Sequence, residues 1–303
     1  MTKGRHGNIL YISNMHSWRQ KLLKVEGLTK VYPKFKLDDV SFELPSGYIM
    51  GFIGANGAGK STTLKSIMNI VCPDSGTVEI FGKDMKTKET EIKQEIGFLM
   101  GAVNCYPLVK ISKFLDVTKS FYNEWQDDEC EKYLKKFDID KEKRIKELSQ
   151  GMKVKLGLAV ALSHKAKLFI LDEPTSGLDP VARDEILDIL CDLVADGDKS
   201  VLFSTHITSD LEKCADYILF IKNGLIVADD TKDGLLDSYV ILRGGADEAE
   251  KVAGRAIGMK RNRYNFSALI RACDLAEDDK NFATDRPTLE DIMVYYGRAE
   301  DND

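Results

Sequence analysis

Residues 54–62 read GANGAGKST and fit the pattern G-x-x-x-x-G-K-[ST], in which a glycine-rich loop wraps the phosphates of a nucleotide. Glycines suit this loop because they reach positive φ angles and bring bare backbone N–H groups close to anionic oxygens. Lys60 is expected to contact the β- and γ-phosphates, and the hydroxyl of Ser61 to bind Mg²⁺. The loop residues predicted to bind ATP are Gly54, Asn56, Gly57, Ala58, Gly59, Lys60, Ser61 and Thr62.

The flanks of this loop argue against the alternative, a flexible glycine turn that meets the pattern by accident. Residues 48–53 predict a buried strand, and residues 62–70 predict a helix whose N-terminus faces the anion. A strand, a glycine-rich loop and a helix in this order predict a phosphate-binding loop. The loop does not say what the ATP is used for.

The composition is typical of a globular protein and excludes several other classes. The chain has 303 residues, of which 43% are hydrophobic, enough for a sizeable core. Its net charge is −6, so no basic excess points to nucleic acid. The cysteines are scattered, without a C-x-x-C pair, which argues against a zinc site and favours reduced thiols in the cytosol. Because no apolar run approaches ~18 residues and residues 1–20 lack an apolar core, we expect neither a membrane span nor a signal peptide.

Two carboxylates follow an apolar strand in the second half of the chain. Residues 167–171 predict a buried strand that ends in Asp172 and Glu173. The carboxyl ends of parallel strands are where open α/β sheets bind ligands. With a phosphate-binding loop upstream, Asp172 is predicted to hold Mg²⁺ through water, and Glu173 to polarise the attacking water. The alternative for this pair is a solvated acidic turn.

Three further features are ambiguous when each is considered alone. Residues 200–205 predict the next buried strand, which ends in His206 at the same sheet edge, but a lone histidine is usually structural. Ser149 can cap an apolar helix that starts in Leu-Ser-Gln-Gly-Met at 148–152, and an ordinary capped core helix explains that as well. Tyr32 lies before Pro33 in a loop, and spacing alone gives it no role.

The last predicted element is an amphipathic helix. Thr288 can cap it, Gly297 can close it, and Leu289, Ile292, Met293 and Tyr296 form one apolar face. That face has to be buried against the main domain, a partner or a second copy, and the sequence does not choose among these.

Taken together, the motifs resemble those of the ATP-binding subunit of ABC transporters, over about residues 22–232. Residues 54–62 match the family's Walker A, 168–173 its Walker B with the catalytic glutamate, 176–179 its D-loop and His206 its switch histidine. Residues 148–152 resemble the LSGGQ signature, with Gln150 in place of the first glycine and Met152 in place of the last glutamine. Tyr32 falls where the family stacks an aromatic ring on adenine.

The resemblance implies an α/β fold: a P-loop core with a mainly parallel sheet, an antiparallel β-subdomain and an inserted helical subdomain. The predicted domains are an N-terminal extension (1–21), the ATP-binding domain (22–235, with its helical subdomain at about 103–162) and a C-terminal accessory region (236–303).

The resemblance also implies how such a chain works. Two ATP-binding domains, here most simply two copies, face each other head to tail around two ATP molecules with Mg²⁺. Each ATP then lies between Walker A of one copy and Ser149, Gln150 and Gly151 of the other, near Asp179 of the D-loop. A second helix N-terminus over the γ-phosphate adds N–H donors. The work is done on a separate transmembrane permease, which holds the chain at the cytoplasmic face of the membrane. The signature and the C-terminal extension are similar to those of ABC-2-type exporters linked to multidrug or antimicrobial-peptide resistance.

One departure from the family leaves alternatives open. The family places a glutamine after the strand that corresponds to residues 96–100, and this chain has Gly101 there. Either a neighbour such as Asn104 substitutes, or hydrolysis and coupling are altered. The rival functions are therefore a soluble ABC-type ATPase that acts outside transport, for example on ribosomes or DNA, and a regulatory module that binds ATP without hydrolysing it. The first usually has two cassettes in one chain or long coiled coils, and this sequence has neither.

Overall fold

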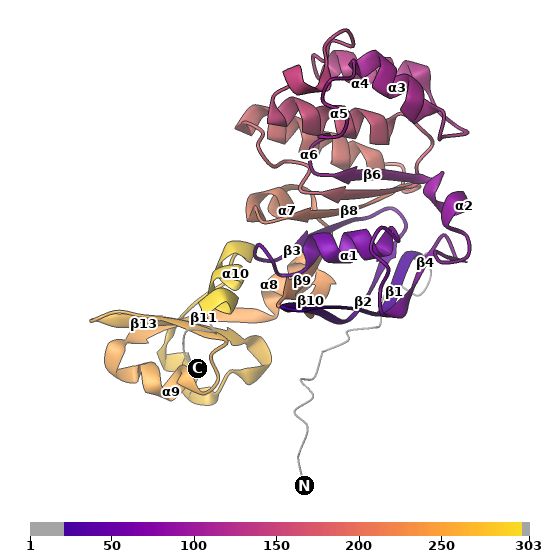
Figure 1. The fold of residues 1–303 in the computed structure, drawn as a ribbon. Helices are drawn as coiled ribbons and strands as arrows, with labels where there is room; N and C mark the ends of the chain where they lie inside the picture. Colours follow the sequence, from indigo (N-terminus) through magenta and orange to yellow (C-terminus); the bar gives the residue numbers. More distant parts are fainter. Residues whose placement is uncertain (1–20, 299–303) are drawn as a thin grey trace. The chain divides into compact units, whose positions relative to one another are not determined.

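The computed structural model describes residues 21–298, and contacts along the chain divide it into two compact units (Figure 1). The first unit runs to Asp229 and the second begins at Asp230. The sequence predicts this boundary between residues 235 and 236. The predicted N-terminal extension lies, apart from Lys21, outside the described residues.

A six-stranded sheet forms the centre of the first unit, in the order β10-β9-β3-β8-β7-β6. The strands that carry the site are β3 (Ile49–Ile53), β7 (Leu168–Asp172) and β8 (Ser200–Thr205). They run parallel, and every residue of the three is buried, as near-continuous apolar runs require. The remaining strands are β6 (Ile96–Met100), β9 (Tyr217–Lys222) and β10 (Leu225–Thr231). The carboxyl ends of β3, β7 and β8 therefore meet at one edge.

A second, antiparallel sheet has the order β2-β1-β4-β5. Its strands are β1 (Lys21–Tyr32), β2 (Phe35–Pro45), β4 (Ser75–Ile80) and β5 (Lys83–Asp84). Helix α1 (Lys60–Ile67) contacts both this sheet and β7 of the parallel sheet. Its Leu64 and Ile67 are fully buried in a core that includes apolar residues of both sheets. This packing anchors α1, and with it the glycine loop before it.

The helices of the first unit gather mainly beyond β6, away from β1 and β2 (Figure 1). They include α3 (Ile111–Lys119), α4 (Asp127–Lys136) and α5 (Gln150–Leu162), with a short 3₁₀ turn, η1 (Ile145–Glu147). Helix α5 packs on β6 and on α4. The other helices are α2 (Glu89–Lys93), α6 (Pro180–Val194) and α7 (Thr208–Cys214). Among residues 21–298, no helix is both long and apolar enough to span a bilayer.

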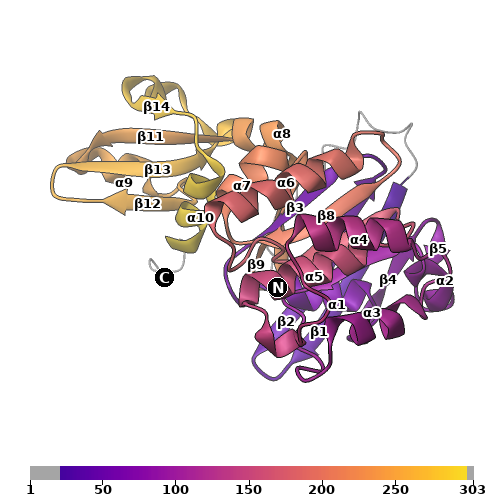
Figure 2. The ribbon, with the colours of Figure 1, turned by 90° about the horizontal axis from the view of Figure 1, so that it is seen from above.

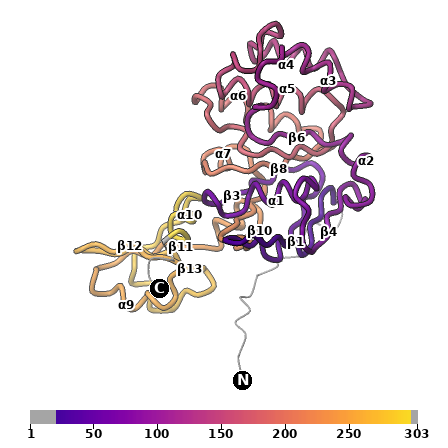
Figure 3. The backbone as a smooth tube through the Cα atoms, viewed as in Figure 1, coloured from indigo at the N-terminus to yellow at the C-terminus, as the bar shows by residue number. Residues whose placement is uncertain are grey.

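The second unit is one continuous segment that begins within the last residues of β10 (Figure 3). It starts with α8 (Lys232–Asp237), and its strands are β11 (Tyr239–Gly245), β12 (Gly258–Arg261), β13 (Asn265–Arg271) and β14 (Ala283–Asp285). They form an antiparallel sheet in the order β12-β13-β11-β14, seen from another side in Figure 2. Helix α9 (Ala249–Ala253) packs on one face, and 3₁₀ turns η2 (Ala246–Glu248), η3 (Ala272–Asp274) and η4 (Glu277–Asn281) complete the unit.

Helix α10 (Leu289–Arg298) packs against β12 and β13, so the apolar face that the sequence left without a partner lies on its own unit. The cap is as predicted, because the Asp291 N–H donates to Thr288 Oγ1 at 3.1 Å. The predicted face was wrong in one detail: Tyr295 is buried, and Met293 only partly. The Tyr295 hydroxyl donates to Ser267 Oγ at 2.8 Å, which turns the ring toward the sheet. The helix continues through Gly297 to Arg298.

Candidate nucleotide site

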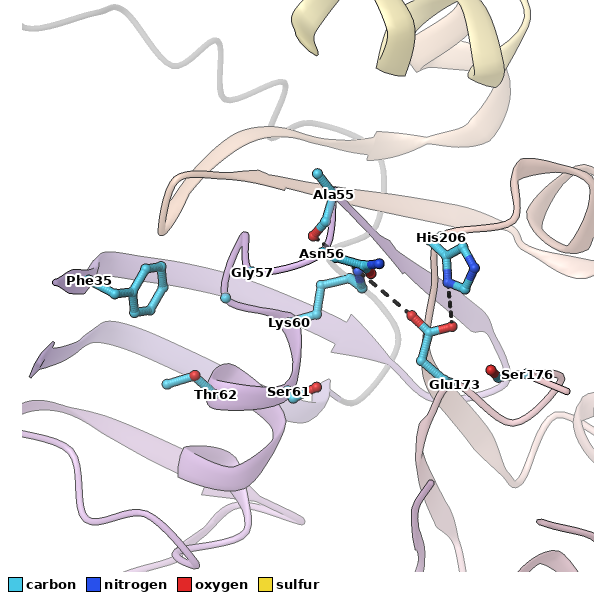
Figure 4. A pocket seen from close by; sticks show the side chains of 11 residues that line it. Phe35, Ala55, Asn56, Gly57, Lys60, Ser61, Thr62, Glu173, Ser176 and His206 are labelled. Carbon is cyan, nitrogen blue, oxygen red and sulfur yellow. Dashed lines mark hydrogen bonds and ion pairs between the residues drawn. The ribbon is translucent and has the colours of Figure 1, made fainter. Parts of the chain in front are cut away.

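A pocket of about 380 Å³ lies where the glycine loop meets the carboxyl ends of β7 and β8 (Figure 4). Its lining residues are Phe35, Ala55, Asn56, Gly57, Gly59, Lys60, Ser61, Thr62, Glu173, Ser176 and His206. Most of the loop residues predicted from the sequence line this pocket. Gly54 and Ala58 do not, although they belong to the same loop.

The glycine loop has the backbone geometry that a phosphate cradle needs. Gly59 has φ +121° at the start of α1, a region that side chains rarely adopt. At Gly54 a Cβ atom would lie only 2.4 Å from the carbonyl oxygen of Ile221, so no larger residue fits there. The loop thus delivers its N–H groups and the positive end of α1 to the pocket.

Lys60 is the buried cation of the site, with only 6% of its surface exposed. Its Nζ donates to the carbonyl oxygen of Gly54 at 2.6 Å and lies 3.7 Å from Glu173 Oε1. Burial lowers the pKa of Lys60, and the nearby carboxylates of Glu173 and Asp172 oppose that shift. Because this ammonium is already removed from water, its attraction to a phosphate is only weakly screened.

Glu173 reaches into the pocket from a strained backbone. Its φ is +53°, in the left-handed region that non-glycine residues seldom occupy. Its carboxylate lies between two partners, Lys60 on one side and His206 on the other, with His206 Nδ1 at 2.8 Å from Oε2 (Figure 4). Strained residues of this kind gather at functional sites. The structure therefore brings together the cation, the acid and the histidine that the sequence proposed separately.

Asp172 and Ser61 are the residues that fit a Mg²⁺ ion. Asp172 ends β7 with 8% exposure, and Ser61 lines the pocket on α1, which contacts β7. Within residues 21–298 no cluster of three or more His, Cys, Asp or Glu side chains could hold a metal. Mg²⁺ commonly binds one or two protein oxygens together with substrate phosphates and water, so this small donor set suits it when a nucleotide is present.

Phe35, for which the sequence predicts no role, lines the pocket with its aromatic ring. Tyr32, the predicted adenine-stacking residue, does not line it and is 38% exposed. The two residues pair across the β1–β2 hairpin, with ring centroids 6.3 Å apart. A Cβ atom on Gly59 would lie 3.0 Å from the Phe35 ring, so this ring packs directly on the glycine loop. The short Pro33-Lys34 turn was the sequence signal that both aromatics lie at one place.

The signature residues lie beside the D-loop and outside the pocket of their own chain. Ser149 caps α5 as predicted, because the Met152 N–H donates to its Oγ at 3.2 Å. A Cβ atom on Gly151 would lie 2.9 Å from the Leu178 side chain. Asp179 caps α6, because its Oδ1 accepts from the backbone N–H groups of Ala182 and Val181. These hydrogen bonds lower the pKa of Asp179. None of Ser149, Gln150, Gly151 and Asp179 lines the pocket.

Gly101 follows β6 directly and has φ +58°, and its N–H donates to the carbonyl oxygen of Asp172 at 3.2 Å. A Cβ atom there would meet no atom within 4 Å, so space for a larger side chain exists. Asn104, the suggested substitute, accepts a hydrogen bond from Lys153 Nζ at 3.4 Å and does not line the pocket.

Comparison with known proteins identifies similar chains. Residues 37–176 match the sequence profile of the family described as ABC transporter. The chain is 30% identical to the ABC transporter ATP-binding protein YtrB of Bacillus subtilis, over 72% of this chain and 75% of that protein. It is 32% identical to the bacitracin transport ATP-binding protein BcrA of Bacillus licheniformis, over 68% of both chains. It is 33% identical to the lantibiotic transport ATP-binding protein SrtF of Streptococcus pyogenes, over 70% of this chain and 92% of that one.

Solved structures agree with these relatives. The ATP-binding subunit of an ABC transporter matches with a TM-score of 0.64 and 28% identity, over 71% of this chain and 91% of that one. The ATP-binding cassette MJ0796, solved as a dimer bound to ADP and phosphate, matches with a TM-score of 0.62 and 22% identity, over 69% and 98%. The second match bears on the fold alone. Together they confirm the predicted fold class.

Proposed function

Because the chain belongs to the ABC transporter family and is an ATPase of that type, we propose that it is the ATP-hydrolysing subunit of a transporter whose permease is a separate chain. The observation that carries the proposal is the convergence of Lys60, Glu173 and His206 on one pocket behind a glycine loop. Each group has a role there: Lys60 for the phosphates, Glu173 for the water, and His206 to orient Glu173 or contact the γ-phosphate.

The hydrolysis step follows from this arrangement. The N–H groups of the loop and Lys60 hold the phosphates, and Glu173 accepts a proton from the attacking water. His206, in hydrogen-bond contact with Glu173, keeps the carboxylate turned toward the pocket. Mg²⁺, held by Asp172 and Ser61, would neutralise charge on the phosphate oxygens.

We further propose that a second copy completes the site. Ser149 and Gly151 do not line the nucleotide pocket of their own chain, which supports this proposal. The N-terminus of their helix can then contact a nucleotide that is bound by another molecule. Helix α5 has 13 residues, so its N-terminus carries an appreciable positive end. In a head-to-tail pair, each γ-phosphate would lie between two helix N-termini, those of α1 and of the partner's α5.

Phe35 is the side chain that we propose stacks on the base of ATP, with Tyr32 supporting its ring from across the hairpin. Base–aromatic stacking contributes about 1–3 kcal/mol, so Phe35→Ala should raise the Kd for ATP about 5–150-fold. Tyr32→Ala should have a smaller effect. Inorganic triphosphate, which has no base, should bind both variants as it binds the parent. Calorimetric titration with ATP and with triphosphate separates these cases. If Tyr32→Ala lost more ATP affinity than Phe35→Ala, Tyr32 would be the residue that stacks on the adenine.

The relatives BcrA and SrtF are described as bacitracin and lantibiotic transport ATP-binding proteins, and the resemblance to ABC-2-type exporters implies export as the direction. We therefore propose that the chain acts at the cytoplasmic face of a membrane, on a permease that expels a peptide-like antibiotic. The helical side of the first unit offers exposed apolar side chains for such a partner. These are Tyr106, Leu108, Val117 and Phe121, each at least 50% exposed.

Co-expression with the permease encoded by a neighbouring reading frame tests this proposal. The tagged chain should co-purify with the permease from detergent-solubilised membranes. Leu108→Ser and Phe121→Ser together should lower the recovered permease about ten-fold, since losing two buried apolar contacts costs more than 1 kcal/mol. Tyr264→Ser, at an exposed aromatic of the second unit, is the matched control and should change nothing. If all variants recovered the same amount of permease, the permease would not bind at Leu108 and Phe121.

A regulatory module with impaired hydrolysis is the second candidate, and Gly101 favours it. A glycine after β6 supplies no side chain toward Mg²⁺ or water. The turnover number of the purified parent chain decides between the two, because a hydrolysis-impaired module would bind ATP and hydrolyse it only very slowly.

A further inference from the structure

Strand β8 is buried along its whole length, yet it contains a polar side chain, Ser204, close to the site. Ser204 is wholly buried, next to Phe203 and in register with Asp172 on β7. Burying a hydroxyl is costly unless it forms hydrogen bonds. The hydrogen bonds of the Ser204 hydroxyl therefore indicate its role.

The hydroxyl of Ser204 contacts both predicted acids of the site. It donates to Asp172 Oδ1 at 2.5 Å and accepts from the backbone N–H of Glu173 at 3.0 Å. The same N–H also donates to the carbonyl oxygen of Ser204 at 3.1 Å. A single residue on β8 therefore holds the end of β7 by two hydrogen bonds of its hydroxyl and one of its carbonyl oxygen.

Each bond has a consequence for the site. The bond to Asp172 restrains the carboxylate, which is buried and would otherwise turn about its side-chain torsions. The bonds from the Glu173 N–H stabilise a backbone at φ +53°, a conformation that costs a non-glycine residue free energy and persists only where its surroundings enforce it. In this conformation the Glu173 side chain lies between Lys60 and His206.

We propose that Ser204 is a positioning residue that orients the metal-binding carboxylate of Asp172 and the base Glu173 together. This inference rests on the roles proposed above for these two acids. Side chains that hold a metal ligand by hydrogen bonds commonly change metal affinity or activity about 10–100-fold when removed. The hydroxyl thus links β8, which is followed by His206, to Asp172 at the end of β7 and to Glu173 directly after it.

The same strand provides a matched control. Ser200, at the other end of β8, is also fully buried, and its hydroxyl donates to the carbonyl of Pro45 at 3.1 Å and accepts from the Gly47 N–H at 2.9 Å. Ser200→Ala therefore removes the same chemistry from the same strand, away from the pocket. A merely structural serine at 204 would behave like Ser200.

The test measures Mn²⁺ binding by electron paramagnetic resonance in the presence of a non-hydrolysable ATP analogue, for Ser204→Ala, Ser200→Ala and Asp172→Asn. Ser204→Ala should weaken Mn²⁺ binding about 10–100-fold and lower the turnover number with little change in KM for ATP. Ser200→Ala should leave both unchanged, even if it unfolds at a lower temperature. Ser204→Thr keeps the hydroxyl and should recover part of the Mn²⁺ affinity.

Two results would overturn the inference. The first leaves the proposed metal site intact, and the second removes it as well. If Asp172→Asn weakens Mn²⁺ binding and Ser204→Ala does not, Ser204 is only a structural residue and the proposed metal site stands. If Asp172→Asn itself binds Mn²⁺ as the parent does, the metal role of Asp172 is wrong and the inference falls with it. Circular dichroism confirms that each variant is folded at the assay temperature.

Discussion

Glu173→Gln is expected to lower the ATPase turnover number about 10²–10⁴-fold, the range that a positioned general base contributes. The amide keeps the size of the side chain and cannot accept the proton of the attacking water. The phosphate contacts of the glycine loop and Lys60 do not depend on that proton, so ATP affinity should be retained. Removing the negative charge beside Lys60 leaves the ammonium free to contact phosphate.

Steady-state release of phosphate measures this effect, and Glu185→Gln is its control. Glu185 is a glutamate on α6 that pairs with Lys155 at 3.5 Å and does not line the pocket. Its amide variant should turn over ATP as the parent does. Parental turnover in Glu173→Gln would assign the base to another group.

Lys60→Ala is expected to weaken ATP binding about 10–100-fold. Hydrogen bonds to charged groups contribute about 1.5–3 kcal/mol each, and the variant also removes a buried charge that faces the phosphates. The effect should appear in Kd itself, in contrast to Glu173→Gln, because Lys60 contacts the nucleotide before any chemistry. Titration with a fluorescent ATP analogue measures it directly.

Lys65→Ala provides the comparison for Lys60. Lys65 lies in the last turn of the same helix and does not line the pocket, so its removal should leave ATP affinity unchanged. Equal Kd values for Lys60→Ala and the parent would contradict the assignment of residues 54–62 as the phosphate loop.

The parts of the site that are local in sequence could be predicted from it. The glycine loop, the cap at Ser149 and the strand that ends in Asp172, with Glu173 after it, each carry their signal within a few residues. Phe35 could not be identified, because its place in the pocket depends on how the β1–β2 hairpin packs on Gly59. The partner of α10 was open for the same reason, since only the folded sheet of the second unit presents β12 and β13 to it.

Ser204 illustrates the limit most clearly. The residues around Ser204 predict a buried strand. No pattern near it predicts a contact with Asp172, which lies 32 residues away in the sequence. The hydrogen bond exists because β7 and β8 are paired in one register, and a shift by one residue would turn the hydroxyl to the other face of the sheet.

The central claim is that the pocket of one chain is completed by the signature of a second. The mass of Glu173→Gln in solution, measured by light scattering with and without ATP, tests it most directly. We expect a single chain of 34.0 kDa without ATP and a pair with ATP. Adding Ser149→Arg, which places a bulky cation at the start of α5, should abolish the pair and leave ATP binding intact. A chain that stays single at saturating ATP, or a pair that survives Ser149→Arg unchanged, would contradict the claim.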